Sequence, residues 1–264
     1  AYLVMKENIE TLLKRNDVNI EDVKGACFGL AGVDVPFQKK ALEEIVEKIG
    51  FKNYIVVNDG FLGIKAASPN GTGVCSINGT GTVNVGIDHH GNGTQVGGIG
   101  YLSGDEAGGS FLARRTIQAA FDASYRFGEE TSLVDDVFKM YEINHKSELA
   151  DALLQKPIDS TYLIKCLCNR ANEGDSVAIS ILETAGHNMA RSTAGVISHL
   201  DFEEPVHVIQ AGSVWSKATA NHMNDKFKDT VLKLSKRKCN FIILNEPPVM
   251  GAIFWAYELA NNTL

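Results

Sequence analysis

Residues 73–86, GVCSINGTGTVNVG, carry the pattern that predicts the fold. Two short apolar runs, VCSI and VNV, flank a central NGTG turn. Apolar runs on both sides of a glycine turn are typical of paired strands. A flexible linker of similar glycine content would be polar and rich in Ser, without interleaved apolar residues. The stretch therefore predicts strands at 73–78 and 82–88, followed by a third at 94–97.

Glycine is concentrated around this stretch. Residues 60–109 hold 15 of the 25 glycines of the 264-residue chain. Glycine is used where φ must be positive or where the backbone must approach another group closely. The span therefore predicts strands joined by tight turns that can cradle a ligand.

The rest of the chain alternates between short apolar runs and amphipathic helical segments. This alternation is typical of parallel strands connected by crossover helices, and it predicts an α/β fold. The expected strands are 23–30, 54–57, 206–210 and 239–244, and the expected helices are 2–15, 36–49, 60–67, 106–122, 131–199 with breaks near 156 and 173, 215–234 and 248–260.

The order of these elements indicates an internal repeat. The later part reads βββ-α-β-α-β-α with a helical insert, and the first part reads α-β-α-β-α. The two orders match if the first part has lost three opening strands. We therefore expect two related α/β domains around a cleft, an incomplete one over 1–71 and a second over 72–264 with an insert at about 126–200.

Composition excludes several classes of partner. The net charge is −7, so the chain has no excess of the basic residues that binding to nucleic acids and anionic membranes requires. No apolar run approaches the roughly 20 residues that span a bilayer, and no secretory signal pattern is present. Five scattered cysteines do not form a disulfide framework. We predict a cytoplasmic protein with no nucleic-acid and no membrane partner.

Two short motifs each allow a functional and a structural interpretation. The turn 78–82, NGTGT, offers free N–H groups and hydroxyls for an anion, although on its own a plain hairpin turn is the better interpretation. Asp59 follows a strand, where a carboxylate can take a proton from a substrate hydroxyl or can cap a helix. The residues favour neither interpretation of Asp59.

Three further motifs follow expected strands or begin helices. In GGIGYLSGDEAGG (97–109), six glycines surround Asp105 and Glu106. Capping of a helix explains the two acids, but the glycines indicate a loop whose backbone reaches a polyhydroxy ligand. QAGSV (210–214) is either an ordinary turn or a turn whose small residues let a flat ring or a phosphate lie on the backbone. PPVMGA (247–252) places a glycine in the first turn of the last helix.

Taken in this order, the motifs resemble the N-acetylglucosamine kinase family, within the BadF/BadG/BcrA/BcrD-type ATPases of the actin-like sugar-kinase superfamily. The segments that carry the resemblance are ACFGLAGVD (26–34), VVNDG (56–60), INGTGTVNVG (77–86), GGIGYLSGDEAGGSFLA (97–113), QAGSV (210–214) and PPVMGAIFWA (247–256). The resemblance implies two ribonuclease-H-like domains around a nucleotide cleft. The family's first phosphate loop does not precede Tyr2, so we expect about 40–50 further residues ahead of Ala1.

The resemblance implies ATP-dependent phosphorylation of an amino sugar at its 6-hydroxyl, with Mg²⁺ and with Asp59 as the general base. N-acetylglucosamine, glucosamine and N-acetylmuramate all remain open as substrates, and a homodimer is expected. The implied sugar-binding residues are Asn58, Thr80, Gly98, Gly100 and Asp105, and the implied nucleotide-binding residues are Gly79, Thr80, Gly81, Thr82, Gly212, Ser213 and Gly251.

Two alternatives stay open at this stage. An ATPase that activates a 2-hydroxyacyl-CoA dehydratase would need cysteines for an iron–sulfur cluster, and Cys166 and Cys168 form only an isolated CxC in a helical region. A relative that binds nucleotide and sugar without turnover is the second alternative.

Overall fold

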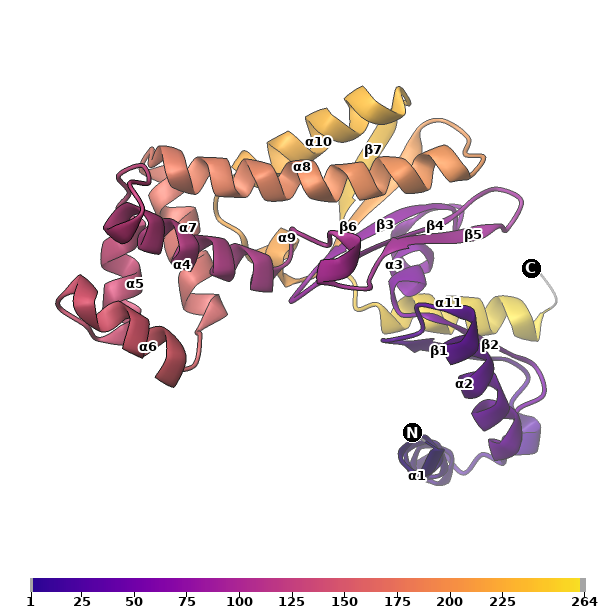
Figure 1. The fold of residues 1–264 in the computed structure, drawn as a ribbon. Helices are drawn as coiled ribbons and strands as arrows, with labels where there is room; N and C mark the ends of the chain where they lie inside the picture. The colour runs from indigo at the N-terminus through magenta and orange to yellow at the C-terminus, as the bar shows by residue number, and fades with distance from the viewer. Residues whose placement is uncertain (1, 262–264) are drawn as a thin grey trace.

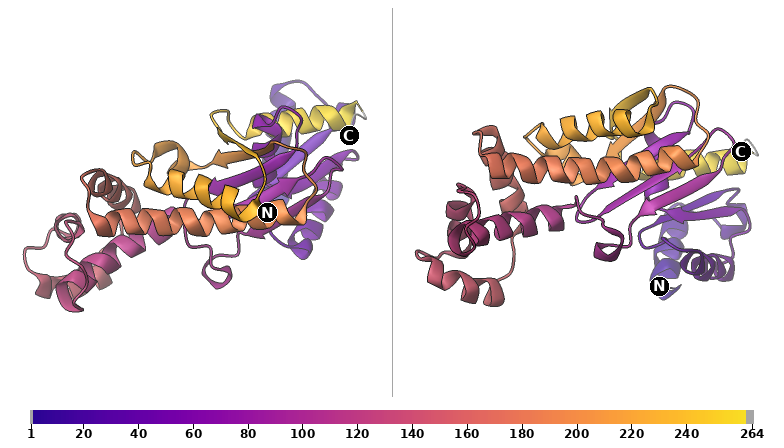
Figure 2. Two further views of the ribbon diagram at one scale, coloured as in Figure 1. Left: turned by 90° about the horizontal axis from the view of Figure 1, so that it is seen from above. Right: turned by 45° about the horizontal axis from the view of Figure 1, so that its top comes forward.

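The computed structural model describes residues 2–261 and places two β-sheets next to each other, with a helical arm that extends from the larger sheet (Figure 1). The two sheets lie at one end of the molecule and the arm projects from them in every view (Figure 2).

The larger sheet has the strand order β5-β4-β3-β6-β7. The glycine-rich stretch forms β3 (Gly73–Asn78), β4 (Thr82–Ile87) and β5 (Gly93–Gly97), and β4 is antiparallel to both of its neighbours. The strands β6 (Val206–Ala211) and β7 (Cys239–Ile243) continue the sheet in parallel with β3. The three predicted strands around the NGTG turn are confirmed.

The smaller sheet consists of β1 (Ala26–Leu30) and β2 (Tyr54–Asn58), which run parallel with α2 (Pro36–Ile49) between them. The path β1-α2-β2 matches the path from β6 to β7 in the larger sheet, as the repeat predicts. Within residues 2–261, only α1 (Tyr2–Arg15) and a single 3₁₀ turn precede β1, and no strand pairs with its outer edge.

Two helices fill the space between the sheets. The helix α3 (Gly60–Ala67) contacts both sheets, and α11 (Val249–Ala260) packs against α3 and β1 (Figure 1). A Cβ on Gly251 would lie 2.0 Å from the backbone oxygen of Leu62, so only glycine lets the two helices approach this closely. This apolar layer joins the sheets; its buried members are Val57, Leu62, Ile64, Cys75, Val85, Ile87, Ile209, Ala211 and Trp255.

The other face of the larger sheet is covered by α8 (Ser176–His199), which packs on β3, β4 and β5, and by α10 (His222–Ser235), which packs on α8. The helix predicted at 215–234 is wrong as a single element, because α9 (Ser213–Lys217) and α10 are separate. Trp215 donates its ring N–H to the backbone oxygen of Ser76 at 3.0 Å. This contact holds α9 against β3, and the chain turns before α10 begins.

The arm contains α4 (Gly109–Tyr125), α5 (Leu133–Tyr141), α6 (Leu149–Gln155) and α7 (Ser160–Asn172). The predicted breaks near 156 and 173 are confirmed, and a further break follows Glu142, whose φ is 54°. Because α8 packs on the sheet, it belongs to the sheet layer although it lies inside the span predicted as the insert.

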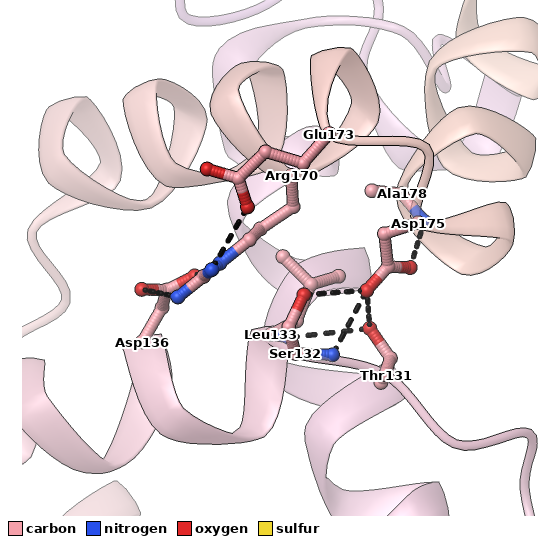
Figure 3. Close-up of polar contacts among 8 residues, drawn as sticks. All are labelled: Thr131, Ser132, Leu133, Asp136, Arg170, Glu173, Asp175 and Ala178. Carbon is pink, nitrogen blue, oxygen red and sulfur yellow. Dashed lines mark hydrogen bonds and ion pairs between the residues drawn. The ribbon is translucent and has the colours of Figure 1, made fainter.

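A polar cluster fixes the junction of α5, α7 and α8 (Figure 3). Asp175 accepts hydrogen bonds from the backbone N–H of Ala178 and from Thr131 and Ser132, at 2.7–3.0 Å. Burial acts to raise the pKa of the Asp175 carboxyl, but these hydrogen bonds outweigh burial and lower that pKa. Beside it, Arg170 forms an ion pair with Asp136 at 2.7 Å, which bridges α7 to α5, and a second with Glu173 at 2.9 Å, at the end of α7.

Replacing Asp175 with Ala should lower the free energy of unfolding by about 2 kcal/mol, because the cap of α8 and the bonds to Thr131 and Ser132 are lost together. A carboxyl whose folded pKa is depressed stabilises the fold above its unfolded pKa of about 3.9, and this contribution disappears as the pH falls through the lower folded value. Denaturant unfolding of both proteins from pH 7 to pH 3 measures the difference. A difference that grows on acidification would contradict the assignment.

Candidate active site

Three turns meet at the carboxyl ends of β2, β3 and β6. Asp59 follows β2, Asn78 ends β3, and Gly212 follows β6. A Cβ on Gly212 would lie 2.4 Å from the backbone oxygen of Asn78, and one on Gly60 would lie 3.0 Å from Ile77. The three turns are therefore neighbours, at the edge where open α/β sheets bind their ligands.

The Asp59 carboxylate is open to solvent at this edge. Asp59 precedes the first residue of α3, but its side chain makes no capping hydrogen bond. Asn58 takes that role instead, because its Oδ1 accepts the backbone N–H of Gly60 at 2.8 Å. Across residues 2–261, no side chain or backbone group is recorded as a hydrogen-bond or ion-pair partner of the Asp59 carboxylate, which leaves it available to a substrate.

Asn58, which precedes Asp59, belongs to a hydrogen-bond network that the sequence did not indicate. Asp34 Oδ1 accepts hydrogen bonds from Asn58 Nδ2 at 3.0 Å and from Gln95 Nε2 at 2.8 Å. Both ends of the Asn58 amide are thus used within the protein, so Asn58 positions the turn rather than reaching outward. Asp34 belongs to the AGVD segment at 31–34, which is part of the family resemblance and could have identified it. No sequence motif includes Gln95 in β5. The three residues border a cavity of about 480 Å³ between the two sheets.

The turn 79–81 closes the hairpin of β3 and β4, so the structural interpretation of NGTGT is correct as far as it goes. The backbone oxygens of Gly79 and Thr80 accept the N–H groups of Gly109 and Ser110, at 2.8 and 3.0 Å. Over the described part of the chain, the amides of Thr80 and Gly81 have no recorded partner. Cβ atoms on both glycines would point into open space. The turn therefore also presents free donors to a ligand.

Asn78 adds an unusual polar group to this turn. It is completely buried, and both its Nδ2 and its Oδ1 lack a hydrogen-bond partner among residues 2–261. Buried amides without partners are costly, and they commonly mark a place where water, an ion or a ligand binds. Nδ2 and the free amides fit phosphate oxygens. Asn78 Oδ1 and the Asp59 carboxylate are oxygen ligands of the kind that Mg²⁺ takes.

The loop 97–108 folds back on itself through Asp105. Asp105 Oδ2 accepts the backbone N–H of Gly100 at 2.6 Å and the hydroxyl of Ser103 at 2.9 Å. Gly97, Gly98, Gly100 and Gly104 have φ between 77° and 93°, a region that favours glycine. Asp105 therefore organises a loop that only glycines can form.

The helix predicted to start at 106 begins at Gly109, so the interpretation of Asp105 and Glu106 as caps is wrong. The reason is a tertiary contact. A Cβ on Gly108 would lie 2.5 Å from the backbone oxygen of Thr80, and the chain stays extended there so that the first turn of α4 can meet the hairpin.

A cavity of about 390 Å³ lies between the hairpin turn and this loop. It brings together the predicted residues Thr80, Gly81, Thr82, Gly98, Gly100 and Asp105. The sequence missed the opposite wall, where Arg114 pairs with Glu106 at 3.3 Å and lies over the ring of Tyr101. The other lining residues are Tyr101 and Glu106, from the loop predicted to reach a ligand, and Ser110, Phe111 and Arg114, which the sequence did not indicate.

A third cavity, of about 350 Å³, lies between α7 and α9. Ser213 lines it, and Thr161, Lys165 and Lys217 are wall residues that the sequence did not indicate. Gly251 borders none of these cavities, and its close approach is to α3.

Comparisons with known proteins bear on the family and the fold. A curated N-acetylmuramic acid/N-acetylglucosamine kinase of Clostridium acetobutylicum is 25% identical over 96% of this chain and 83% of its own length. The solved structure of a candidate N-acetylglucosamine kinase from Chromobacterium violaceum superposes with a TM-score of 0.64 at 17% identity, over 92% of this chain and 80% of that one.

The solved structure of a candidate N-acetylglucosamine kinase from Porphyromonas gingivalis gives a TM-score of 0.62 at 18% identity, over 96% of this chain and 83% of that one. These likenesses confirm the predicted fold, with its two α/β lobes of the actin-like kind. The model of the BadF/BadG/BcrA/BcrD ATPase family matches residues 1–256. The chain belongs to the BadF/BadG/BcrA/BcrD ATPase family.

Proposed function

We propose that this protein is a kinase that transfers the γ-phosphoryl group of ATP to the 6-hydroxyl of an amino sugar, with Asp59 as the general base. The observation that carries the proposal is the Asp59 carboxylate, which is exposed, free of a capping role and next to a turn with unpartnered donors. A carboxylate at that edge can accept the hydroxyl proton while the turn holds the phosphates.

We place the remaining groups of the reaction in the turns and cavities described above. The adenosine would lie in the cavity beside Ser213, and the phosphates would lie along 78–82, which borders Gly212. The sugar would occupy the cavity between the turn and the Asp105 loop. Such a reaction depends mainly on positioning and charge neutralisation. Bound Mg²⁺ would neutralise phosphate charge, with Asn78 Oδ1 as a buried oxygen ligand on the protein side.

The substrate class rests on the curated relative, whose name gives N-acetylmuramic acid and N-acetylglucosamine as substrates. A cavity that is lined by glycine backbone, Thr80 and Asp105 offers donors and acceptors for several hydroxyls. We therefore place N-acetylglucosamine, N-acetylmuramate and glucosamine in one class of acceptors.

The test is an assay of ADP release by the complete protein with ATP, Mg²⁺ and a panel of these three sugars, with glucose and buffer as controls. We expect turnover with at least one amino sugar well above the rate with buffer. ATP hydrolysis that is equal with every sugar and with buffer would overturn the kinase proposal. Binding of ATP and sugar without turnover would assign the protein to the non-catalytic alternative.

The cysteines do not favour the dehydratase-activating alternative. Cys27 and Cys75 lie on strands of different sheets, and burial raises the pKa of each thiol to about 12, which disfavours the thiolate that a cluster needs. Cys166 and Cys168 lie on α7, where Cys168 is buried in the apolar core.

We also propose a cytoplasmic location, on the five free cysteines, and a homodimer, for which Phe254 and Tyr257 on the exposed side of α11 offer apolar surface. The charge of −7 does not support binding to nucleic acid. Among the helices within residues 2–261, none combines the length and the apolar character that a membrane span requires.

A further inference from the structure

A cluster of two histidines and an aspartate lies at the end of the larger sheet that is remote from the candidate active site. His89 and His90 stand in the turn between β4 and β5, and Asp201 stands in the connection from α8 to β6. Both segments lie at the end of the molecule opposite the helical arm (Figures 1 and 2). The opposite end of β4 carries the turn 79–81, so the cluster is separate from the proposed phosphate site.

The ligand atoms of the three side chains converge. His89 Nε2 is 3.8 Å and His90 Nε2 is 3.6 Å from Asp201 Oδ2, and one ligand atom from each residue lies within 4.8 Å of the others. Nitrogen and oxygen ligands bound at about 2.0–2.2 Å to one tetrahedral ion lie roughly 3.4 Å apart. The two separations from Asp201 Oδ2 are close to that value, and the three side chains are exposed enough to move the remaining distance.

The tautomer of His89 is the one that a metal ligand requires. His89 Nδ1 lies 2.7 Å from the backbone oxygen of Asp201. A carbonyl oxygen can only accept, so Nδ1 carries the proton and the lone pair of Nε2 faces the cluster. A ligating histidine characteristically donates its other ring N–H to a backbone carbonyl or carboxylate in this way.

The backbone around the cluster is held in place by Asp88, which is 3% exposed. Asp88 Oδ1 accepts the backbone N–H groups of His90 and Asn92, at 2.9 and 2.8 Å, and Oδ2 accepts that of Asp201 at 3.4 Å. One side chain thus fixes the turn that carries the histidines and the connection that carries Asp201. The two imidazole rings also contact each other, with centroids 3.8 Å apart.

We propose that His89, His90 and Asp201 bind a divalent transition-metal ion of the Zn²⁺ type, with water as a fourth ligand. Two imidazole nitrogens and one carboxylate oxygen suit Zn²⁺ and its first-row neighbours, whereas Mg²⁺ prefers oxygen ligands alone. The ion would join the β4–β5 turn to the α8–β6 connection. It would stabilise this end of the larger sheet without contacting the phosphoryl-transfer site.

The experiment is a calorimetric titration of the metal-free complete protein with ZnCl₂ in the presence of excess Mg²⁺, on the wild type and on the double variant His89→Ala/His90→Ala. The matched control is His187→Ala, because His187 is an exposed histidine on α8 outside the cluster. We expect the double variant to bind one equivalent fewer than wild type, and each single variant to bind that equivalent at least about tenfold more weakly. The control should match wild type. The melting temperature should rise with Zn²⁺ in wild type and control by more than in the double variant.

Equal numbers of equivalents and equal affinities in wild type and the double variant would overturn the proposal, because binding would then occur at the cysteines or elsewhere. No binding by wild type at millimolar Zn²⁺ would overturn it as well. If the double variant does not fold, Asp201→Asn provides the same comparison. Visible absorption of the Co²⁺-substituted protein gives an independent signal that the cluster variants should lose.

Discussion

The variant Asp59→Asn should lose turnover of amino sugars by about 10³-fold or more while it keeps its fold and its affinity for ATP. Asparagine has the shape of aspartate but cannot accept the proton of the sugar hydroxyl, and general bases contribute about 10²–10⁴-fold to rate. The Asp59 side chain makes no capping hydrogen bond, so its replacement removes nothing recorded from the folded state. Steady-state kcat from ADP release, together with calorimetric ATP affinity and melting temperature, measures the three properties separately.

A matched control for this variant is Asp151→Asn, since Asp151 is an exposed aspartate on α6 in the arm. It changes the net charge equally and should retain wild-type kcat. Turnover by Asp59→Asn near the wild-type level would remove Asp59 from the role of base and would leave the open carboxylate without an assigned function. Loss of ATP affinity in the same variant would indicate that Asp59 acts on the metal–nucleotide complex instead.

The strands were predictable because their signals are local. β3 and β4 show apolar runs around a glycine turn, and β2 and β6 are short apolar runs bounded by turn residues. The parallel order of the strands also followed, because helices separate them in the chain. The two-lobed arrangement was predicted from the repeated order of elements. That order can be read without knowing any single contact.

The errors and omissions come from contacts between segments that are distant in sequence. Gln95 is 61 residues from Asp34, to which it donates. Trp215 donates to Ser76 across 139 residues and so holds α9 against β3. Neither contact leaves a periodic pattern in the sequence, so local propensity could not reveal Gln95 or the break after 217.

Glycines are the hardest residues to interpret from sequence, because a close approach can be to a ligand or to another part of the same chain. Gly251 meets the backbone of Leu62, and its place near the nucleotide stays a prediction. Gly79 and Gly81, in contrast, have open space where a Cβ would be. Only the structure separates glycines required by packing from glycines that leave room for a ligand.

Gly108 links packing to the proposed chemistry, and Gly108→Ala should lower kcat/KM for ATP by about 100-fold. Its φ of −66° and ψ of 173° suit alanine, so the backbone itself tolerates the change. The added Cβ, however, would lie 2.5 Å from the oxygen of Thr80 and 2.8 Å from the Cα of Gly81. Either α4 or the phosphate turn must move, and a displacement of about 1 Å at reacting groups can cost about 10²-fold in rate.

The control for this variant is Gly174→Ala. Gly174 has a φ of 93°, so alanine there introduces backbone strain, but a Cβ would meet nothing and the position lies in the arm. We expect Gly174→Ala to lower the melting temperature and to keep wild-type kcat/KM, whereas Gly108→Ala loses activity out of proportion to any loss of stability.

If both variants lose activity only in proportion to stability, the contact between α4 and the turn 79–81 has no role in holding the phosphates. A selective loss in Gly108→Ala would instead mean that the start of α4 sets the position of the turn, because the close approach at Gly108 adds to the hydrogen bonds that Gly109 and Ser110 donate to the turn.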